Sequence, residues 1–270
     1  MVKEKMTKDN KINTLYWADV LQVARLNHTP IPQISKEITS FSRAEAYTIQ
    51  ELQMKACLES GETQVGWKMG LTSEAKRRQM NLDSPLYGFL TNKMQVADGG
   101  VFPLEGSIHP KIEPEIAFLI SKDLAGNVTR EQVLAACGGV ASALEILDSR
   151  YTEFKYFSME DVIADNSSSS DFVVGPWVKD FKNIDLIHLK MEMFVDGKPV
   201  QTGISKDISG DPVASVIQLC ALLAERDQVL KAGSIVLAGA ATAAEMLKPG
   251  MKVSLNVDQL PPVSVTVKGN

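Results

Sequence analysis

The sequence predicts an α+β fold, in which a mixed, mostly antiparallel, rolled β-structure follows a helical N-terminal region. Three observations support this prediction. Residues 1–64 carry helix signals, whereas residues 65–270 consist largely of short apolar stretches separated by glycine and proline. Strand candidates outnumber helices after residue 65. Only some of the gaps between them could hold a crossover helix, which disfavours a doubly wound sheet. We therefore expect two regions, 1–64 and 65–270.

The N-terminal region contains one helix with defined ends. Ser42 and Glu45 have the spacing of a capping box, in which a hydroxyl and a carboxylate bind the free amides of a first turn. Gly61 is a suitable C-terminal stop. This pattern predicts a helix over residues 43–60.

The second region contains seven strand candidates, each a short apolar run bounded by turn residues. They are residues 65–71, 112–120, 143–147, 172–174, 186–195, 234–238 and 252–257.

Two helices interrupt these strands. Thr129 and Gln132 form a second capping box, and we expect the helix that they open to stop at Gly138-Gly139. Asp211 is a suitable N-cap with Pro212 at the first helical position, and the apolar residues that follow recur at helical spacing. The second helix therefore has one apolar face for packing against the sheet.

The composition limits the classes of partner. The formal net charge of −5 argues against nucleic acid, because binding to phosphates needs a basic surplus. No apolar run reaches the roughly 18 residues that suggest a membrane span. The N-terminus lacks a secretory signal pattern, and Cys57, Cys137 and Cys220 are odd in number and far apart. These features predict a cytoplasmic protein with reduced thiols.

Residues 109–120 carry the most informative pattern. If this segment is a strand, Glu113 and Glu115 project to the same face, because side chains alternate. Two neighbouring carboxylates raise each other's pKa unless a cation lies between them, and hard oxygen ligands suit Mg²⁺ or Mn²⁺. Glu145, an acid within an apolar strand-like run, is a third candidate ligand. Three inward carboxylates would leave coordination positions open for water or substrate.

The spacing alone leaves an alternative open for each acid. A Glu-x-Glu pair is common on the solvated face of an antiparallel sheet, and Glu145 can point outward from a half-buried strand.

Lys68 lies between glycines and apolar residues in the segment 65–72. Glycine lets the backbone come near a ligand, so this lysine is a candidate for contacting a bound carboxylate. The alternative is an exposed lysine on an edge strand. Residues 148–151 and 161–170 indicate a polar loop with a cap, for which a functional role is the minority interpretation.

Five ordered blocks carry a resemblance to a known family. They are residues 66–73, 85–88, 109–116, 144–151 and 164–168. From about residue 15 to the C-terminus, the chain resembles the 2-oxopent-4-enoate hydratase and 4-oxalocrotonate decarboxylase family, within the fumarylacetoacetate-hydrolase-like superfamily. The resemblance implies that fold, with residues 65–270 as the catalytic domain.

The resemblance also implies a set of site residues. The family's metal ligands fall on Glu113, Glu115 and Glu145, which would hold Mg²⁺ or Mn²⁺, and its substrate-contacting lysine falls on Lys68. Within the same blocks we expect Leu86 to be catalytic. The expected substrate-binding residues are Trp67, Leu71, Ser167 and Ser168.

Leu86 bears on the choice between the family's two activities. Hydratases of the family typically carry an aspartate, used as an acid/base, in a Pro-Asp-Tyr-Gly or Pro-Asp-Phe-Gly sequence, where this chain has Leu86. Residues 241–244, Ala-Thr-Ala-Ala, also look like the decarboxylase branch. The resemblance therefore favours metal-dependent decarboxylation of 2-oxo-3-hexenedioate to 2-hydroxypenta-2,4-dienoate and CO2, in the meta-cleavage degradation of aromatic compounds. Homo-oligomerisation and a complex with vinylpyruvate hydratase are further implications.

Three alternatives remain at this point. The nearest is 2-oxopent-4-enoate (vinylpyruvate) hydratase. The second is a hydrolase of acylpyruvates from the same superfamily. The third is a non-catalytic metal-binding subunit that stabilises a hydratase.

Overall fold

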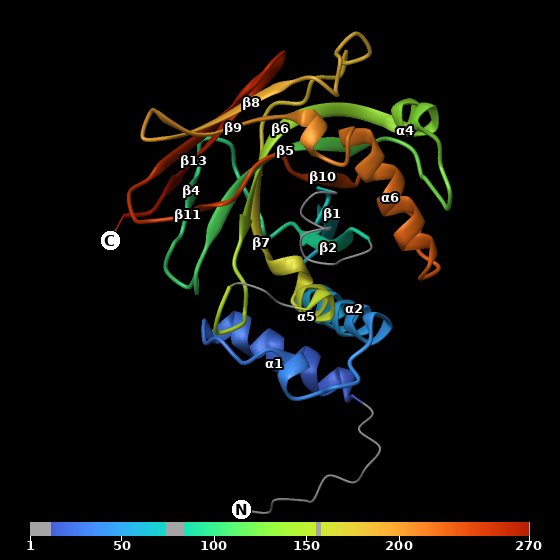
Figure 1. The fold of residues 1–270 in the computed structure, drawn as a ribbon, viewed down its shortest axis with the longest axis vertical. Coiled ribbons are helices and arrows are strands. Elements are labelled where there is room, and N and C mark those ends of the chain that lie inside the picture. The colour runs from blue at the N-terminus through green and yellow to red at the C-terminus, as the bar shows by residue number, and fades with distance from the viewer. Residues whose placement is uncertain (1–11, 74–83, 155–157, 270) are drawn as a thin grey trace, which may run out of the picture.

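The structure is a computed structural model that describes residues 12–73, 84–154 and 158–269. Its helices lie in two groups. Figure 1 places α1, α2 and α5 together at one end of the molecule, and α4 and α6 beside the strands. The helices are α1 (Thr14–Asn27), α2 (Arg43–Glu59), α4 (Arg130–Ala136), α5 (Met159–Ala164) and α6 (Pro212–Ala224), with 3₁₀ turns η1 (Ile34–Lys36), η2 (Asn166–Ser168) and η3 (Ser205–Asp207).

The predicted helix starts are confirmed. The Ser42 side chain accepts from the Glu45 amide, and the Glu45 carboxylate accepts from the Ser42 amide at 2.9 Å. Thr129 opens α4 with the same reciprocal arrangement, and Asp211 caps α6 ahead of Pro212. Each cap satisfies amides that have no partner within the helix.

An eight-stranded sheet forms the centre of the molecule. Its order is β2-β1-β10-β5-β6-β7-β3, and β11 pairs with β5. Two pairings, β1 with β10 and β3 with β7, are parallel, and the others are antiparallel. The strands are β1 (Gln64–Gly70), β2 (Leu86–Thr91), β3 (Gln95–Val96), β5 (Lys111–Ile120), β6 (Cys137–Leu147), β7 (Ser169–Val174), β10 (Ile235–Ala240) and β11 (Glu245–Met246).

A second sheet of five strands packs on the first, with β13 against β6. Its order is β4-β13-β12-β8-β9, and only β4 pairs in parallel. The strands are β4 (Val101–Phe102), β8 (Lys190–Val195), β9 (Lys198–Ile204), β12 (Lys252–Val257) and β13 (Leu260–Val267). The predicted mixed, mostly antiparallel α+β structure is confirmed.

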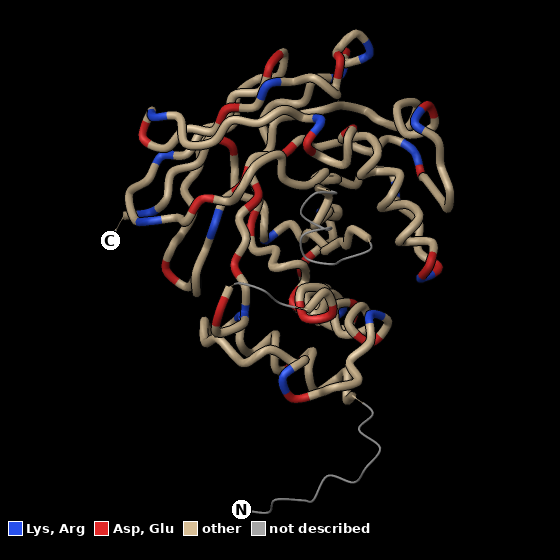
Figure 2. The backbone as a smooth tube through the Cα atoms, viewed as in Figure 1, with Lys and Arg blue, Asp and Glu red and all other residues tan. Residues whose placement is uncertain are grey.

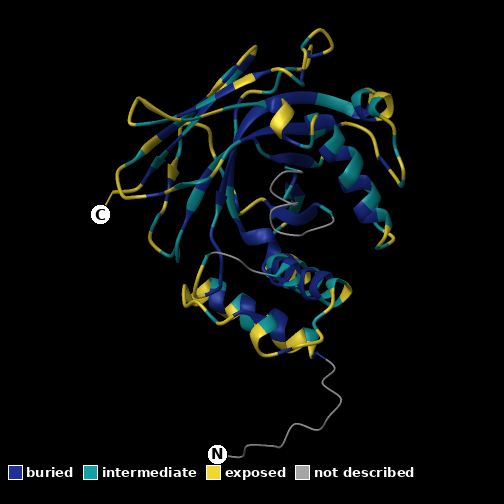
Figure 3. Ribbon diagram, in the orientation of Figure 1, coloured by how far each residue is buried: buried dark blue, intermediate teal, exposed yellow. Residues whose placement is uncertain are grey.

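The large sheet is rolled. Met94 follows the end of β2, and its carbonyl accepts from the Phe172 amide in β7 at 2.9 Å. β2 also contacts β7 directly. The two ends of the strand order therefore approach each other. A small apolar cluster that includes Leu90, Ala117 and Leu237 lies inside the roll. Figure 3 shows the buried residues concentrated in these strands.

A larger core cluster fills the space between the sheets and the helices, and it includes residues of α1 and α2 as well as of both sheets. The predicted division into 1–64 and 65–270 stays a prediction, although β1 begins at Gln64, beside that boundary. Figure 2 shows acidic and basic residues mixed along the helices and the strands.

One stretch of the described residues, Ser205–Ala224, is long and apolar enough by composition to cross a membrane, and half of it is buried inside the fold. It contains α6, which packs on β10 and α4. Core helices commonly have this composition.

Three sequence expectations differ from the structure. The helix from Thr129 ends at Ala136, and Gly138-Gly139 lie in β6, where a Cβ on Gly138 would approach Ser121 to 3.1 Å. The expected strand 186–195 is shorter in the structure, where β8 begins at Lys190. Residues 186–189 do not pair in a sheet, although Leu186 and Leu189 are buried. The polar stretch 161–170 contains most of α5, the turn η2 and the start of β7.

Candidate metal centre

The candidate site begins with three glutamates from two neighbouring strands. Glu113 and Glu145 are directly opposite each other in the β5/β6 pairing, and Glu115 lies two residues further along β5 on the same face. One carboxylate oxygen from each of the three lies within 4.8 Å of the others. Glu115 and Glu145 are 0% exposed, and Glu113 is half-buried. The alternatives of a solvated Glu-x-Glu face and of an outward Glu145 are therefore wrong.

Glu115 shows the electrostatic cost of this arrangement. Burial, followed by the Glu145 and Glu113 carboxylates, raises the pKa of Glu115 well above its usual range. One of its oxygens, Oε2, accepts from the Gly239 amide at 2.7 Å. The other, Oε1, is buried and has no hydrogen-bond partner among the described residues.

An unpaired buried carboxylate oxygen is unfavourable, and a cation that binds there removes both that cost and the repulsion between the acids. Three carboxylates are the ligand set of a hard divalent cation such as Mg²⁺ or Mn²⁺. The residues present therefore fit the metal that the sequence predicts.

A bulge in β10 supplies the amide that holds Glu115. The β10/β5 register shifts between Leu237 and Ala240, which turns the Gly239 N–H toward the carboxylate. Gly239 has φ 104°, and a Cβ there would lie 2.4 Å from Thr72 Oγ1. Glycine is therefore required at this position.

Lys68 lies beside the triad. It is 2% exposed on β1, which pairs with β2 on one side and β10 on the other, so the edge-strand alternative is wrong. Its Nζ is 3.0 Å from Glu145 Oε2 and donates to the Ser167 carbonyl at 3.1 Å. Burial lowers the pKa of Lys68, but the carboxylates of the triad, with Glu145 first, raise it further, so the net pKa is above the usual value. The neighbouring carboxylates therefore favour the ammonium form of Lys68.

Leu86 and Ser167 lie near Lys68. Gly70 pairs with Leu86 and follows Lys68 by two residues, so these side chains share one face of β1 and β2. A Cβ on Gly70 would lie 2.7 Å from both Leu86 Cδ1 and Ser167 Oγ. The structure thus brings together Lys68, Leu86, Ser167 and the triad, and Leu86 is fully buried.

The other expected substrate-binding residues lie elsewhere or face away. Trp67 projects to the opposite face of β1 and packs edge-on against Tyr87, with 5.3 Å between ring centroids. The Ser168 hydroxyl donates to Asp165 Oδ2 at 3.4 Å. Leu71 is half-buried, packs against the main core and has a left-handed backbone with φ 55°. Their substrate-binding role stays a prediction.

A second buried polar cluster supports η2 and β7. Arg150 Nε donates to Asp165, and Arg150 Nη1 donates to the carbonyls of Asp148 at 2.7 Å and Ser169 at 3.0 Å. Burial raises the pKa of Asp165 to about 6, although Arg150 and the Ser149 hydroxyl act against that rise. This cluster, rather than a loop, accounts for the polar residues of 148–151 and 164–169.

Sequence reasoning missed two groups at the triad. One is the Gly239 amide, for which the available signal was a glycine directly after the strand candidate 234–238. The other is the Ser169 hydroxyl, which donates to Glu145 Oε1 at 3.1 Å. It lies in a run of four serines, and nothing in that run distinguishes it.

The rolled sheet and the buried triad define a class of protein whose carboxylates are arranged as ligands for a divalent cation. No protein-family profile matches the chain. A curated relative, 4-oxalocrotonate decarboxylase from a Pseudomonas species, is 44% identical over 252 residues, which cover 93% of this chain and 97% of that protein. The chain belongs to the 4-oxalocrotonate decarboxylase family.

Two further comparisons agree with this assignment. The structure of 4-oxalocrotonate decarboxylase from Pseudomonas putida G7, complexed with magnesium and adipate, superposes with a TM-score of 0.91 at 34% identity and covers 98% of this chain and all of that one. A 2-hydroxyhexa-2,4-dienoate hydratase from Comamonas testosteroni is 38% identical over 198 residues, or 72% of this chain and 75% of that protein.

Proposed function

We propose that the protein catalyses the Mg²⁺- or Mn²⁺-dependent decarboxylation of 2-oxo-3-hexenedioate to 2-hydroxypenta-2,4-dienoate and CO2. The observation that carries the proposal is the buried triad of Glu113, Glu115 and Glu145 with Lys68 against it. The similar decarboxylase from P. putida G7 was solved with magnesium and the six-carbon diacid adipate, which supports both the metal and the class of substrate.

In this reaction the bond between C5 and C6 breaks, CO2 leaves, and the electron pair spreads through the vinyl group to the C2 oxygen. The resulting dienolate takes a proton on that oxygen to give the dienol. A divalent ion held by the triad would supply Lewis-acid stabilisation of the negative charge on oxygen.

Lys68 is the side chain that can stabilise this negative charge. Because its ammonium is buried and fixed between Glu145 and the Ser167 carbonyl, it can give a charge-assisted hydrogen bond without reorganising. We assign it the role of orienting the C1 end of the substrate and stabilising the enolate oxygen.

Leu86 suits the departing end of the substrate. Loss of C6 as CO2 needs no proton acceptor, and a carboxylate there would repel the C6 carboxylate of the bound substrate. A fully buried leucine presents no charge and disfavours the localised carboxylate relative to the delocalised dienolate.

The test is to incubate the metal-free protein with 2-oxo-3-hexenedioate and follow CO2 and dienol before and after adding Mg²⁺ or Mn²⁺. Metal-dependent CO2 release is the expected result. Lys68→Met, which keeps the apolar stem and removes the charge, should lose most of the rate. If the wild-type protein binds the metal but releases no CO2, the proposal is refuted.

The second candidate is hydration of 2-hydroxypenta-2,4-dienoate, and the similarity to the C. testosteroni hydratase favours it as the alternative. The same preparation distinguishes the two, because a hydratase would consume the dienol and release no CO2 from the diacid.

We also propose the finer features that the family resemblance implies. The protein would act in the cytoplasm, in the meta-cleavage degradation of aromatic compounds, as a homo-oligomer and in a complex with vinylpyruvate hydratase. The complex is supported by the chemistry, because a hydratase would consume the dienol product directly. Co-purification from the source cells, followed by light scattering of the isolated protein, tests both associations.

A further inference from the structure

Glu145 is contacted at both of its carboxylate oxygens, by a hydrogen bond at Oε1 and by an ion pair at Oε2. Oε1 accepts from the Ser169 hydroxyl at 3.1 Å, and Oε2 lies 3.0 Å from the Lys68 ammonium. A carboxylate turns easily about its last torsion, whose energy profile is broad. A hydrogen bond to Oε1 therefore sets the plane of the group and the direction in which Oε2 points.

A β-bulge directs Ser169, rather than the next residue, toward Glu145. In the β6/β7 pairing Ile146 is opposite Asp171, and the register then shifts so that Leu147 is opposite Ser169. Ser170 is the extra residue of the bulge, and its hydroxyl donates to Asp171 at 2.6 Å. Bulges beside active sites commonly re-aim a side chain in this way.

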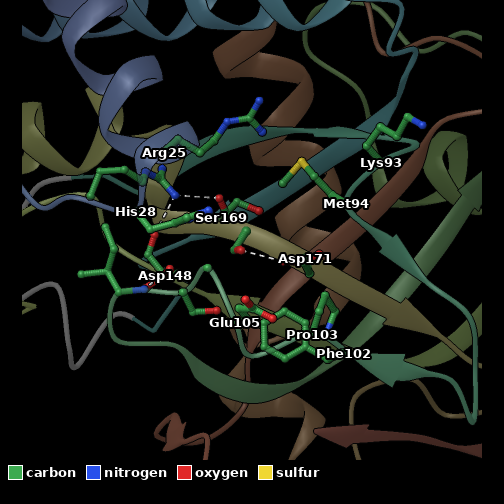
Figure 4. Close-up of a pocket in the computed structure, with 15 residues that line it drawn as sticks. Arg25, His28, Lys93, Met94, Phe102, Pro103, Glu105, Asp148, Ser169 and Asp171 are labelled. Carbon is green, nitrogen blue, oxygen red and sulfur yellow. Dashed lines mark hydrogen bonds between the residues drawn. The ribbon is translucent and has the colours of Figure 1, made fainter. Parts of the chain in front are cut away.

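The backbone of Ser169 is fixed by a hydrogen bond from Arg150. Arg150 Nη1 donates to the Ser169 carbonyl at 3.0 Å, and both residues are less than 5% exposed. Ser169 lines a cavity of about 220 Å³. Figure 4 shows it there together with Asp148 and Asp171. The hydroxyl of Ser169 nevertheless binds Glu145, so this serine links the Arg150 cluster to the triad.

We propose that Ser169 is a positioning residue for the metal centre, acting through its hydrogen bond to Glu145 Oε1. It fixes the plane of the Glu145 carboxylate, with Oε2 facing Lys68, within the group of three carboxylates. This inference rests on the proposed function only in requiring that the triad binds a divalent cation. Because partners of metal ligands typically contribute about 10–100-fold to metal affinity, the loss of this hydroxyl has a measurable consequence.

The test is the affinity of the metal-free protein for Mn²⁺, measured by electron paramagnetic resonance of the free ion and by calorimetry. Ser169→Ala should raise the Mn²⁺ dissociation constant by about 10–100-fold. Ser169→Thr, which restores a hydroxyl, should recover most of the affinity. Ser170→Ala is the matched control, because the Ser170 hydroxyl donates to Asp171 and not to the triad. This variant should bind Mn²⁺ as wild type does.

A merely structural role for Ser169 would lower the urea midpoint of the metal-free protein without a specific loss of Mn²⁺ affinity, and that result would overturn the proposal. If Ser169→Ala does not fold, Ser169→Cys, with similar volume and a weaker donor, should show the same change in affinity in a smaller degree. If wild type and the folded Ser169 variant bind Mn²⁺ equally well, the positioning role of Ser169 is refuted, but the proposed function is not. Absence of Mn²⁺ binding by wild type refutes both proposals.

Discussion

Two buried polar clusters lie side by side in this protein, and they differ in charge balance. The triad places three carboxylates against one ammonium, and Oε1 of Glu115 has no hydrogen-bond partner among the described residues. The neighbouring cluster pairs one guanidinium, Arg150, with one carboxylate, Asp165, and serine hydroxyls and backbone carbonyls complete its hydrogen bonds. In the second cluster Arg150 and the hydrogen bonds oppose the rise in the Asp165 pKa that burial causes, so the chain itself offsets part of the burial cost.

The difference separates a binding site from a structural support. A balanced, fully bonded cluster needs no ligand, and its role is to hold residues 148–151 and 165–169 in place. An unbalanced one is stable only if its acids share protons or bind a cation. The comparison therefore predicts opposite responses to mutation and to metal.

The largest effect should follow loss of a triad carboxylate. Glu113→Gln removes one of the three anionic ligands, and metal-dependent CO2 release should fall by more than about 100-fold, since loss of a ligand's hydrogen-bond partner alone typically costs about 10–100-fold. The measurement is CO2 release at saturating Mg²⁺ together with Mn²⁺ affinity. Retained activity with undiminished affinity would remove Glu113 from the ligand set.

Breaking the balanced cluster should instead destabilise the fold. Arg150→Ala leaves the Asp165 carboxylate buried without its charge partner, which costs roughly 3–5 kcal/mol of unfolding free energy. Urea unfolding with and without Mg²⁺ measures it. Lys231→Ala, at an exposed ion pair, is the control and should leave the midpoint unchanged. An Arg150→Ala protein as stable as wild type would contradict the structural role.

Adding a charge to the unbalanced cluster should slow catalysis. Leu86→Asp would place a further carboxylate at the position proposed for the departing C6 group, and CO2 release should fall by about tenfold, equivalent to a barrier increase of about 1.4 kcal/mol. Leu86→Asn, similar in size and uncharged, separates the charge from the loss of the apolar surface. An unchanged rate in Leu86→Asp would remove Leu86 from the mechanism.

The smallest effect concerns pH. The pKa of Glu115 is raised in the folded protein above an unfolded value of about 4.3, so the folded state binds this proton more tightly. The unfolding free energy of the metal-free protein therefore loses a contribution as the pH rises from about 4.3 to the folded pKa. Glu115→Gln should flatten that fall.

Urea midpoints in EDTA, measured at several pH values from about 5 to 8, test this, and saturating Mg²⁺ should flatten the wild-type curve as well. Parallel curves for wild type and Glu115→Gln without metal would show that the triad carries no excess charge.

Local signals made much of this fold predictable. The Ser42 and Thr129 capping boxes and the Asp211 cap each act within three residues, so they can be identified from sequence. Strand alternation placed Glu113 and Glu115 on one face for the same reason. The pairing of Glu113 with Glu145 depends on a register between separate strands, which no local pattern encodes. The family resemblance implied only that the two acids are ligands of the same metal.

The remaining features depend on irregular backbone. The bulges that aim the Gly239 amide and the Ser169 hydroxyl break the alternation on which sequence reasoning relies. Residues 166–168, Asn-Ser-Ser, all have positive φ, although none is glycine. The surrounding contacts, including those of Asn166 with the Phe89 backbone, impose that conformation. Such tertiary constraints leave little trace in composition.

The central claim is that Glu113, Glu115 and Glu145 together hold one divalent cation. Crystals of the protein grown with Mn²⁺ would test it most directly, through the anomalous scattering of the ion. We predict one strong anomalous peak within coordination distance of all three carboxylates, and its loss in Glu115→Gln crystals. A peak elsewhere, or none in wild type at saturating Mn²⁺, would contradict the account.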